Sequence, residues 1–287
     1  MGFALLRNKP NAHFTATYRP SDPTHSKRLS IVQHGATPIC ADLSNPKHLL
    51  KLLPLAQRIV WMAPPNTHTP IDTTLKKLIL YSAARTQNKK SSPTTITYIS
   101  TTGVYGNTQG QWINEHTPIC PHTARAKRRA QAEQHLKTGL RHGVRIHIVR
   151  APGIYSAKRL PIQRIQAGTP ALLPEEDSWS NHIHEQDLAR LSLWVNYKGG
   201  AYCLVNACDK HPSKMGDYFD LIADAHKLPR PTRLPASEVK QQVSATLWSF
   251  MTESRRIESL NQKKLGFKLN YESVGDFIRN NQHGRRQ

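Results

Sequence analysis

The chain has 287 residues, 38% of them hydrophobic, and a formal net charge of +21 at neutral pH. This length accommodates one large α/β domain with a smaller lobe. No apolar run approaches the roughly 18–20 residues that span a bilayer, which excludes a membrane-spanning protein and predicts no membrane partner. The apolar segment 1–7 is too short for the hydrophobic region of a secretory signal, so we expect a cytoplasmic location.

The first two thirds of the chain alternate between β-rich segments and segments with helical spacing. Strands are predicted at 13–18, 36–42, 58–63, 94–100 and 145–149, and helices at 70–84 and 123–142. Strands separated by helices are typical of a parallel sheet joined by right-handed crossovers. The sequence therefore predicts an α/β fold built on a parallel sheet.

The pattern changes beyond Arg150, where Pro152-Gly153 interrupts it. Helices are predicted at 160–166, 185–195 and 218–226, a strand at 201–206, a proline-rich loop at 228–235, and a polar, mostly helical segment at 239–281. We therefore expect a sheet domain over residues 1–150. A small C-terminal α/β lobe over residues 151–287 would be interleaved with it.

The positive charge is spread along the chain, and its one dense run is residues 125–129 (RAKRR). Net charge of this size can indicate nucleic-acid or anionic-ligand binding. However, no helix-turn-helix, zinc-finger or aromatic-interleaved RNA-binding motif accompanies the run. We interpret it as a solvated helix face and expect no nucleic-acid partner.

No metal site is predicted from the cysteines or histidines. Structural zinc sites need closely spaced ligand pairs, and no CxxC pair occurs among the four cysteines, which are Cys40, Cys120, Cys203 and Cys208. His182 and His184 are two residues apart and would share a face on a strand, but a third ligand is not evident. The alternative is that His184 packs in the interior or caps the helix that begins at Glu185.

The segment Ser100–Gly106 (STTGVYG) follows a β-branched run and so comes at the end of a buried strand. Ligands of open α/β sheets bind at the carboxyl ends of strands, where hydroxyl groups can bond a substrate oxygen. The segment resembles the serine/threonine motif of the extended short-chain dehydrogenase/reductase family, which includes sugar-nucleotide epimerases and dehydratases. Three later segments resemble that family in the same order, namely 149–155, 181–189, and 253–257 with 265–267.

The resemblance implies a Rossmann-like, NAD(P)-binding sheet domain followed by a substrate lobe. Such folds open with a strand, a glycine-rich turn and a helix whose N-terminus holds the pyrophosphate. Residues 1–7 resemble the last glycine of that turn, Gly2, and the helix after it, so the first strand would be missing. The second and fourth strands of the family sheet would then each have one unpaired edge. The alternatives are that Gly2 only happens to lie near the start, or that the start site was wrongly chosen.

The residue after the strand at 13–18 is Arg19. In dinucleotide folds an acidic residue at this place binds the ribose hydroxyls, whereas arginine accommodates a 2′-phosphate. Arg19, alone or with Lys27 or Arg28, therefore favours NADP, and NAD remains the other possibility. The alternative is a surface arginine in a basic protein.

Other cofactor contacts follow from the resemblance. Asp42 and Leu43 take the place of an acidic–apolar pair that contacts the adenine, and Asp42 could also cap a helix over 45–53. Ala63 and Pro64 resemble the small-residue turn that lines the cofactor, where small side chains allow close backbone approach. Ser100 is also placed at the cofactor.

The catalytic residues of the family are a Ser/Thr, a Tyr, and a Lys four residues after that Tyr, which lets the phenol exchange a proton with substrate. Thr101 takes the Ser/Thr position. On the helix that follows, Arg125 takes the Tyr position and Arg129 the Lys position, while a second register sets Lys127 opposite Thr123. Neither register supplies a tyrosine, and none occurs between Tyr105 and Tyr155.

This departure changes the expected chemistry. Arginine is effectively always protonated, so it is a poor acid or base but a good ligand for carboxylates and phosphates. Tyr105 could replace the missing phenol only if it pointed into the cleft, and the alternative is that it packs under the cofactor loop. Thr101 and Thr102 could also be strand-end hydroxyls that bond backbone groups.

Three functional hypotheses remain. The first is an NAD(P)-dependent epimerase/dehydratase-like oxidoreductase for an anionic or sugar-like small molecule, in which Thr101 holds a substrate oxygen and Arg125 and Arg129 neutralise its charge. The second is a dinucleotide-binding sensor or regulator without turnover. The third is a nucleic-acid binder driven by net charge.

Overall fold

The computed structural model describes residues 2–7, 13–19, 26–65, 72–87 and 93–284. The chain divides into two compact units. Unit 1 comprises residues 1–100, 127–150 and 188–205, and unit 2 comprises residues 101–126, 151–187 and 206–287. Both units thus take segments from either side of residue 150.

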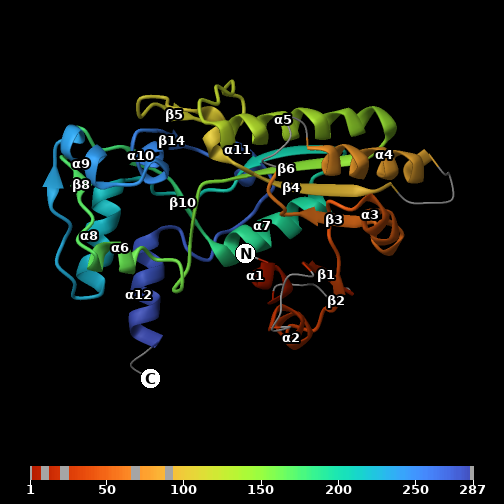
Figure 1. Cartoon of the computed structure of the whole chain (residues 1–287), viewed down its shortest axis with the longest axis horizontal. Helices are drawn as coiled ribbons and strands as arrows, with labels where there is room; N and C mark the ends of the chain where they lie inside the picture. The colour runs from red at the N-terminus through yellow and green to blue at the C-terminus, as the bar shows by residue number, and fades with distance from the viewer. Residues whose placement is uncertain (1, 8–12, 20–25, 66–71, 88–92, 285–287) are drawn as a thin grey trace. The chain divides into compact units, whose positions relative to one another are not determined.

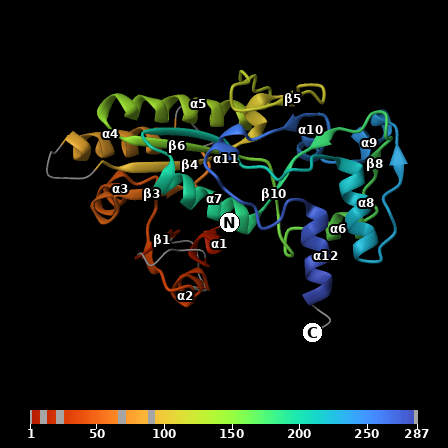
Figure 2. The same ribbon diagram turned by 180° about the vertical axis from the view of Figure 1, so that it is seen from behind.

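A four-stranded sheet forms the centre of unit 1. Its order is β11-β6-β4-β3, with bounds β3 (Arg58–Trp61), β4 (Thr95–Thr101), β6 (Arg145–Ala151) and β11 (Tyr202–Asn206). Strands β3 and β4 run parallel, with Arg58 opposite Thr95. Helices α4 (Thr73–Gln87) and α5 (Ala124–Thr138) lie on one side of this sheet and α7 (Glu185–Lys198) on the other (Figures 1 and 2). The α/β fold with a parallel sheet predicted from the sequence is confirmed.

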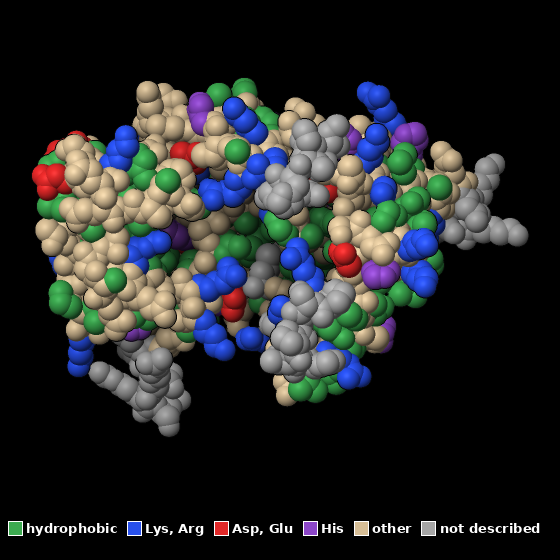
Figure 3. Space-filling view, in the orientation of Figure 1, with side chains coloured by type: hydrophobic (Ala, Val, Ile, Leu, Met, Phe, Trp, Pro, Cys, Tyr) green, Lys and Arg blue, Asp and Glu red, His purple; other side chains and the backbone are tan. Residues whose placement is uncertain are grey.

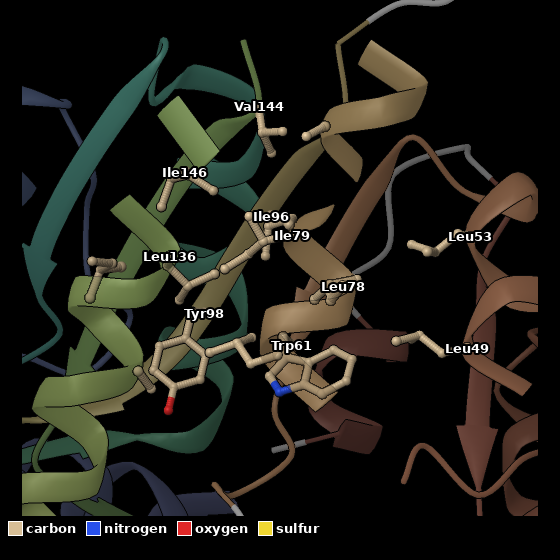
Figure 4. Close-up of a cluster of buried hydrophobic side chains, with 14 residues drawn as sticks. Leu49, Leu53, Trp61, Leu78, Ile79, Ile96, Tyr98, Leu136, Val144 and Ile146 are labelled. Atoms are coloured by element: carbon tan, nitrogen blue, oxygen red, sulfur yellow. The ribbon is translucent and has the colours of Figure 1, made fainter. Parts of the chain in front are cut away.

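The alternation of side chains along the strands supplies the main core of unit 1. Ile96 and Tyr98 of β4 point to the same face as Ile146 of β6, because successive strand residues point to opposite faces. There they pack against Ile79 of α4 and Leu136 of α5 (Figure 4). The cluster is continuous from β6 to Trp61 on β3 and excludes water from that face.

The opposite face of β4 is joined to α7 by polar contacts. The Thr97 hydroxyl accepts a hydrogen bond of 2.9 Å from Nδ2 of Asn196 on α7. The Arg58 guanidinium donates to the Asn196 backbone carbonyl at 2.5 Å. His147 lies 3.4 Å from the Thr97 hydroxyl, and burial lowers the pKa of its imidazole. These contacts fix the position of α7 against the sheet.

Unit 1 also contains a separate two-stranded parallel sheet of β1 (Thr15–Tyr18) and β2 (Thr37–Cys40), with Thr15 opposite Thr37. Helices α1 (Gly2–Arg7) and α2 (Ser26–Gln33) pack with this pair, whereas α3 (Pro46–Leu52) packs with α4. Among the described residues β1 pairs only with β2, and β3 pairs only with β4. Among these residues β1 and β3 therefore each have one unpaired edge. Helix α2 was not predicted, and Ile31 is its buried residue.

Unit 2 is built from short strand pairs and helices. The pairs are β7 (Gly153–Tyr155) with β10 (His182–His184), β5 (Trp112–Ile113) with β14 (Arg256–Ile257), β8 (Ala171–Leu172) with β13 (Arg233–Leu234), and β9 (Trp179–Ser180) with β12 (Ser213–Lys214). Its helices are α6 (Ile162–Gln166), α8 (Met215–Ala225), α9 (Ala236–Gln242), α10 (Ala245–Met251), α11 (Leu260–Lys264) and α12 (Val274–Gly284). Aromatic and aliphatic residues of α8 and α12 form its core with Tyr155.

Candidate functional site

The segment Ser100–Gly106 leaves β4 and forms a single 3-10 turn, Thr102–Tyr105. The Thr101 side chain caps this turn, because its Oγ1 accepts a hydrogen bond of 3.1 Å from the Gly103 amide. Tyr105 is buried, and its hydroxyl donates to Oδ1 of Asn206 at 2.9 Å. The phenol of Tyr105 is therefore a packing group, as the alternative interpretation predicted, and Thr101 remains partly exposed.

Gly106 ends the turn with a backbone that only glycine adopts easily, at φ +71°. A Cβ atom on this residue would lie 2.2 Å from the Cys120 carbonyl oxygen and 2.6 Å from Nδ1 of His122. The Cys120 amide donates to the Val104 carbonyl at 3.0 Å. Glycine at this place therefore lets the loop before α5 close on the turn that carries Thr101.

Arg125 lies in the first turn of α5, whose entry is capped by the Thr123 hydroxyl accepting from the Ala126 amide at 3.2 Å. Its side chain is exposed, and its Cζ is 4.3 Å from the centre of the Phe250 ring. Among the described residues no carboxylate pairs with Arg125. The neighbouring Arg255 is different, because it is buried and donates to the Gly106 carbonyl and to Glu253.

The Phe250 ring thus holds the Arg125 guanidinium, and the N–H groups of this guanidinium have no carboxylate partner among the described residues. An aromatic ring under an arginine holds it by a cation–π contact and leaves its edge available. Planar N–H donors of this kind suit the two oxygens of a carboxylate or phosphate. Thr101 and Arg125 both belong to unit 2.

The Arg129 side chain forms hydrogen bonds within unit 1. Its Nη1 donates to the Tyr98 hydroxyl at 2.9 Å and to the Ile99 carbonyl at 2.8 Å. Burial raises the pKa of the Tyr98 phenol to about 12, so it stays protonated at neutral pH. Sequence reasoning did not single out Tyr98, because a buried tyrosine on a strand gives no signal of a polar partner.

The Ser100 hydroxyl also forms a hydrogen bond with a buried side chain of unit 1. Its hydroxyl donates to Oε1 of Glu133 at 2.5 Å, and Glu133 accepts from Nη2 of Arg150 at 2.7 Å. All three side chains are buried in unit 1. The structure thus directs the Ser100 hydroxyl toward α5, whereas the resemblance had placed this residue at the cofactor.

Arg19 directly follows β1, and Asp42 follows β2 with Ala41 between them. The Asp42 carboxylate accepts from the Ser44 hydroxyl at 2.7 Å and the Ser44 amide at 2.9 Å. These bonds, with smaller effects of His48 and the Arg19 charge, lower the pKa of Asp42. The prediction that Asp42 caps the next helix is wrong, because Asn45 caps α3 by accepting from the Lys47 amide.

The remaining candidate cofactor residues lie around the same strands. Gly2 is the first residue of α1, and a Cβ there would meet Met62 at an ordinary 3.8 Å. Leu43 and Ala63 are half-buried against the unit 1 core, and Pro64 is exposed. The Arg19 guanidinium and the Asp42 carboxylate both come after the carboxyl ends of the paired strands β1 and β2. The described residues do not form a glycine cradle for its pyrophosphate.

His182 and His184 both lie on β10 and are buried. His184 packs on Tyr271, and its Nδ1 accepts from the Gln186 amide at 3.3 Å, so the packing and capping alternative is confirmed. Among the described residues no group of three or more His, Cys, Asp or Glu side chains is arranged to hold a metal ion. Across the same residues no helix has the length and apolar character needed to cross a membrane. Lys and Arg side chains are scattered over the face shown in Figure 3.

No family model matches the chain. A search of curated proteins also finds no match. Solved structures do resemble it. A functionally unknown conserved protein from Silicibacter pomeroyi has 24% identity and a TM-score of 0.74, with 93% of this chain and 89% of that chain covered. A Thermotoga maritima UDP-glucose 4-epimerase, solved with UDP-glucose, has 12% identity and a TM-score of 0.71 over 96% of this chain and 92% of its own.

A third structure is the UDP-glucuronic acid 4-epimerase from Bacillus cereus in complex with NAD. It has 14% identity and a TM-score of 0.69, and 97% of this chain and 94% of that chain are covered. The chain has the fold of these epimerases. The Rossmann-like resemblance predicted from the sequence is therefore confirmed at the level of the fold. At these identities the likeness carries no substrate from one protein to another.

Proposed function

We propose that the protein binds NADP and is an epimerase/dehydratase-like oxidoreductase for an anionic, sugar-like small molecule. The observation that carries the proposal is the exposed Arg125 guanidinium, which is held on Phe250 without a carboxylate partner among the described residues. In one of the two registers that the family resemblance allows, Arg125 takes the position of the family's tyrosine. A cation fixed there can bind the carboxylate or phosphate of a substrate.

Thr101 and Arg125 have different roles in this proposal. Because the Gly103 amide donates to Oγ1 of Thr101, the hydroxyl proton of Thr101 is available for a substrate oxygen. Arg125 binds charge but cannot act as a base, since arginine stays protonated. Arg129 has no part in this proposal, because its Nη1 is bonded within unit 1 to the Tyr98 hydroxyl and the Ile99 carbonyl. NADP would supply the hydride acceptor, bound through Arg19 at its ribose phosphate and with Asp42 near its adenosine.

The cofactor half of the proposal is tested by calorimetric titration with NADPH and NADH. We expect NADPH to bind more tightly, and Arg19→Ala to weaken NADPH binding about 10-fold or more while changing NADH little, since hydrogen bonds to charged groups contribute about 1.5–3 kcal/mol. Arg141→Ala is a matched control, because Arg141 is an exposed arginine at the end of another element. Absence of binding to either dinucleotide would refute this half.

The substrate half is tested by hydride transfer and epimerisation assays on UDP-sugars with and without a carboxylate. We expect the acidic sugars to be preferred and Arg125→Ala to raise their KM about 10-fold, a loss of roughly 1.4 kcal/mol. Lys137→Ala is the control, because Lys137 is an exposed cation on the same helix that also lies over an aromatic ring, that of Tyr202. Equal KM values for Arg125→Ala and the parent protein would contradict the assignment.

A second candidate function is a dinucleotide-binding sensor without turnover. It is favoured by the arginine at the tyrosine position and by Tyr105, whose hydroxyl is taken up by Asn206. Tight NADPH binding without turnover of any sugar in the panel would favour the sensor over the enzyme.

A further inference from the structure

The positive charge of the protein is concentrated in unit 1. This unit contains 22 Lys and Arg residues and 4 Asp and Glu residues, a formal net charge of +18. Unit 2 contains 18 and 15 residues of these kinds, a formal net charge of +3. The difference is not visible along the sequence, because segments of the two units alternate in the chain. Unit 1 therefore has a strongly positive field of its own.

Exposed cations of unit 1 gather on helices α4 and α5, which lie on the same side of the sheet (Figures 1 and 2). The 3-10 turn Gly139–His142 follows α5 and packs against α4. We call the outer surface of α4, α5 and this turn, with the first residue of β6, the basic face. Its exposed cations are Lys76, Lys127, Lys137, Arg141 and Arg145.

No carboxylate neutralises the basic face. Segments 73–87 and 124–145 contain one acidic residue, Glu133, which is buried and pairs with Arg150. Asp72, just before α4, accepts a hydrogen bond of 3.0 Å from the Leu75 amide at the start of that helix. Among the described residues no ion pair is found for any of the five exposed cations. Their charges are therefore available to an external partner.

The cations are spread over a length that suits a polyanion better than a small anion. Lys127 and Lys137 are ten residues apart on α5, about 15 Å along the helix axis. Over that length a nucleic-acid duplex carries roughly nine phosphate charges. A second copy of the chain does not fit the same face, because like charges repel.

The side chains of the basic face favour a duplex over other anionic partners. No Phe, Trp or Tyr of α4, α5 or the 3-10 turn is exposed, and Leu80 is their one exposed large apolar side chain. Single-stranded nucleic acids are held by bases that stack on aromatic side chains. Helices that lie on membranes insert several large apolar side chains. A duplex needs only cations that face its phosphates.

The basic face also extends away from the carboxyl end of the sheet. The Arg145 amide donates to the Thr94 carbonyl at 2.9 Å, so Arg145 lies beside the amino end of β4. Ser100 is six residues further along the chain, which is about 20 Å of extended strand. Ligands of open α/β sheets bind at the carboxyl ends of strands. Dinucleotide binding therefore does not account for the cations at this end.

We propose that the basic face binds double-stranded nucleic acid through its phosphates, without reading the base sequence. Its Lys and Arg side chains would replace cations that are condensed on the duplex, and the release of those cations drives such binding. From the sequence, the run 125–129 was expected to be a solvated helix face. The fold adds the cations of α4 and of the turn after α5 to the same surface, which no stretch of sequence shows.

The test is fluorescence anisotropy of the full chain with labelled DNA and RNA duplexes of about 20 base pairs, each in two unrelated sequences. We expect a micromolar Kd at about 0.1 M salt, equal for the two sequences of a kind. The logarithm of the binding constant should fall with the logarithm of the salt concentration with a slope of about −4 to −5, if five cations each contact a phosphate. Binding of either kind of duplex in this way supports the proposal.

A triple variant with Lys76→Glu, Lys127→Glu and Arg145→Glu should weaken binding at least about 100-fold at about 0.1 M salt, since each lost phosphate contact removes a factor of roughly 8 there. The salt slope should become shallower by about 3. The matched control reverses three exposed lysines of unit 2 and so changes the net charge equally: Lys240→Glu, Lys264→Glu and Lys268→Glu.

The proposal is overturned if neither duplex binds, or if the control variant loses as much affinity as the triple variant. Binding to vesicles that contain phosphatidylserine, without binding to either duplex, would overturn it by assigning the face to a membrane.

Lysine acetylation of the unmodified protein, with and without duplex and read by peptide mass spectrometry, needs no substitution and stays decisive if the triple variant fails to fold. We expect the duplex to protect Lys76, Lys127 and Lys137 and to leave Lys240 and Lys264 reactive. Equal protection of the two groups of lysines would also overturn the proposal.

Discussion

Replacing Glu133 by Gln tests the buried ion pair of unit 1. The side chains of Glu133 and Arg150 are 2% and 4% exposed, and their closest contact is 2.7 Å. The Arg150 Nε adds bonds of 3.2 and 3.3 Å, and the Ser100 hydroxyl adds one of 2.5 Å. Glutamine has the same shape but no charge, so Glu133→Gln leaves no cavity and removes the negative charge that pairs with Arg150.

The expected loss follows from burial. Removing one partner of a buried pair costs about 3–5 kcal/mol, because the remaining charge stays out of water without compensation. That is a large share of the roughly 5–15 kcal/mol by which a typical domain is stable. The double variant Glu133→Leu with Arg150→Met should regain most of the loss, since neither charge is then buried.

Urea unfolding followed by circular dichroism measures these differences. The control is Glu272→Gln, which breaks the pair between Lys210 and Glu272 at 2.5 Å, with side chains 57% and 51% exposed. A surface pair contributes about 0–1 kcal/mol, whatever its distance. A loss below about 1 kcal/mol for Glu133→Gln, equal to that of the control, would refute the argument that burial sets the energy of this pair.

Three further predictions concern unit 2. Gly106→Ala should destabilise by more than about 1 kcal/mol, since it combines a positive φ with a clash against the Cys120 carbonyl, and an unchanged melting temperature would contradict this. Burial raises the pKa of Asp209, so stability falls as pH rises from the unfolded value of about 3.8 through the folded one. Asp209→Asn should remove that fall, and urea midpoints at several pH values would show whether the slope persists. Burial lowers the pKa of His182 to about 4, so stability is lost as pH falls from about 6.5 to 4. His182→Phe, able to stack on Tyr218, should lessen the loss, and an undiminished drop in melting temperature would count against it.

The local sequence was sufficient to predict the longer strands and helices of unit 1. The β-branched run of β4 and the apolar spacing of α4 each predict one structure, because period and propensity agree. The strand pairs of unit 2 were not predicted. Strands such as β5 and β14 have two residues each, too few to show an alternating pattern, and they pair across more than 140 positions of sequence (Trp112 opposite Arg256).

The candidate site divides in the same way. The sequence by itself predicted that Thr101 lies at a strand end, and β4 does end there. The arginine at the family's tyrosine position stays a prediction from the resemblance, made in one of two registers. Only the tertiary structure decided how the polar groups are used: Arg129 on Tyr98, Ser100 on Glu133, and Arg125 over Phe250 with donors to spare. These partners come from distant parts of the chain. A hydrogen bond or a ring contact depends on where folding brings the two groups, and no local pattern contains that information.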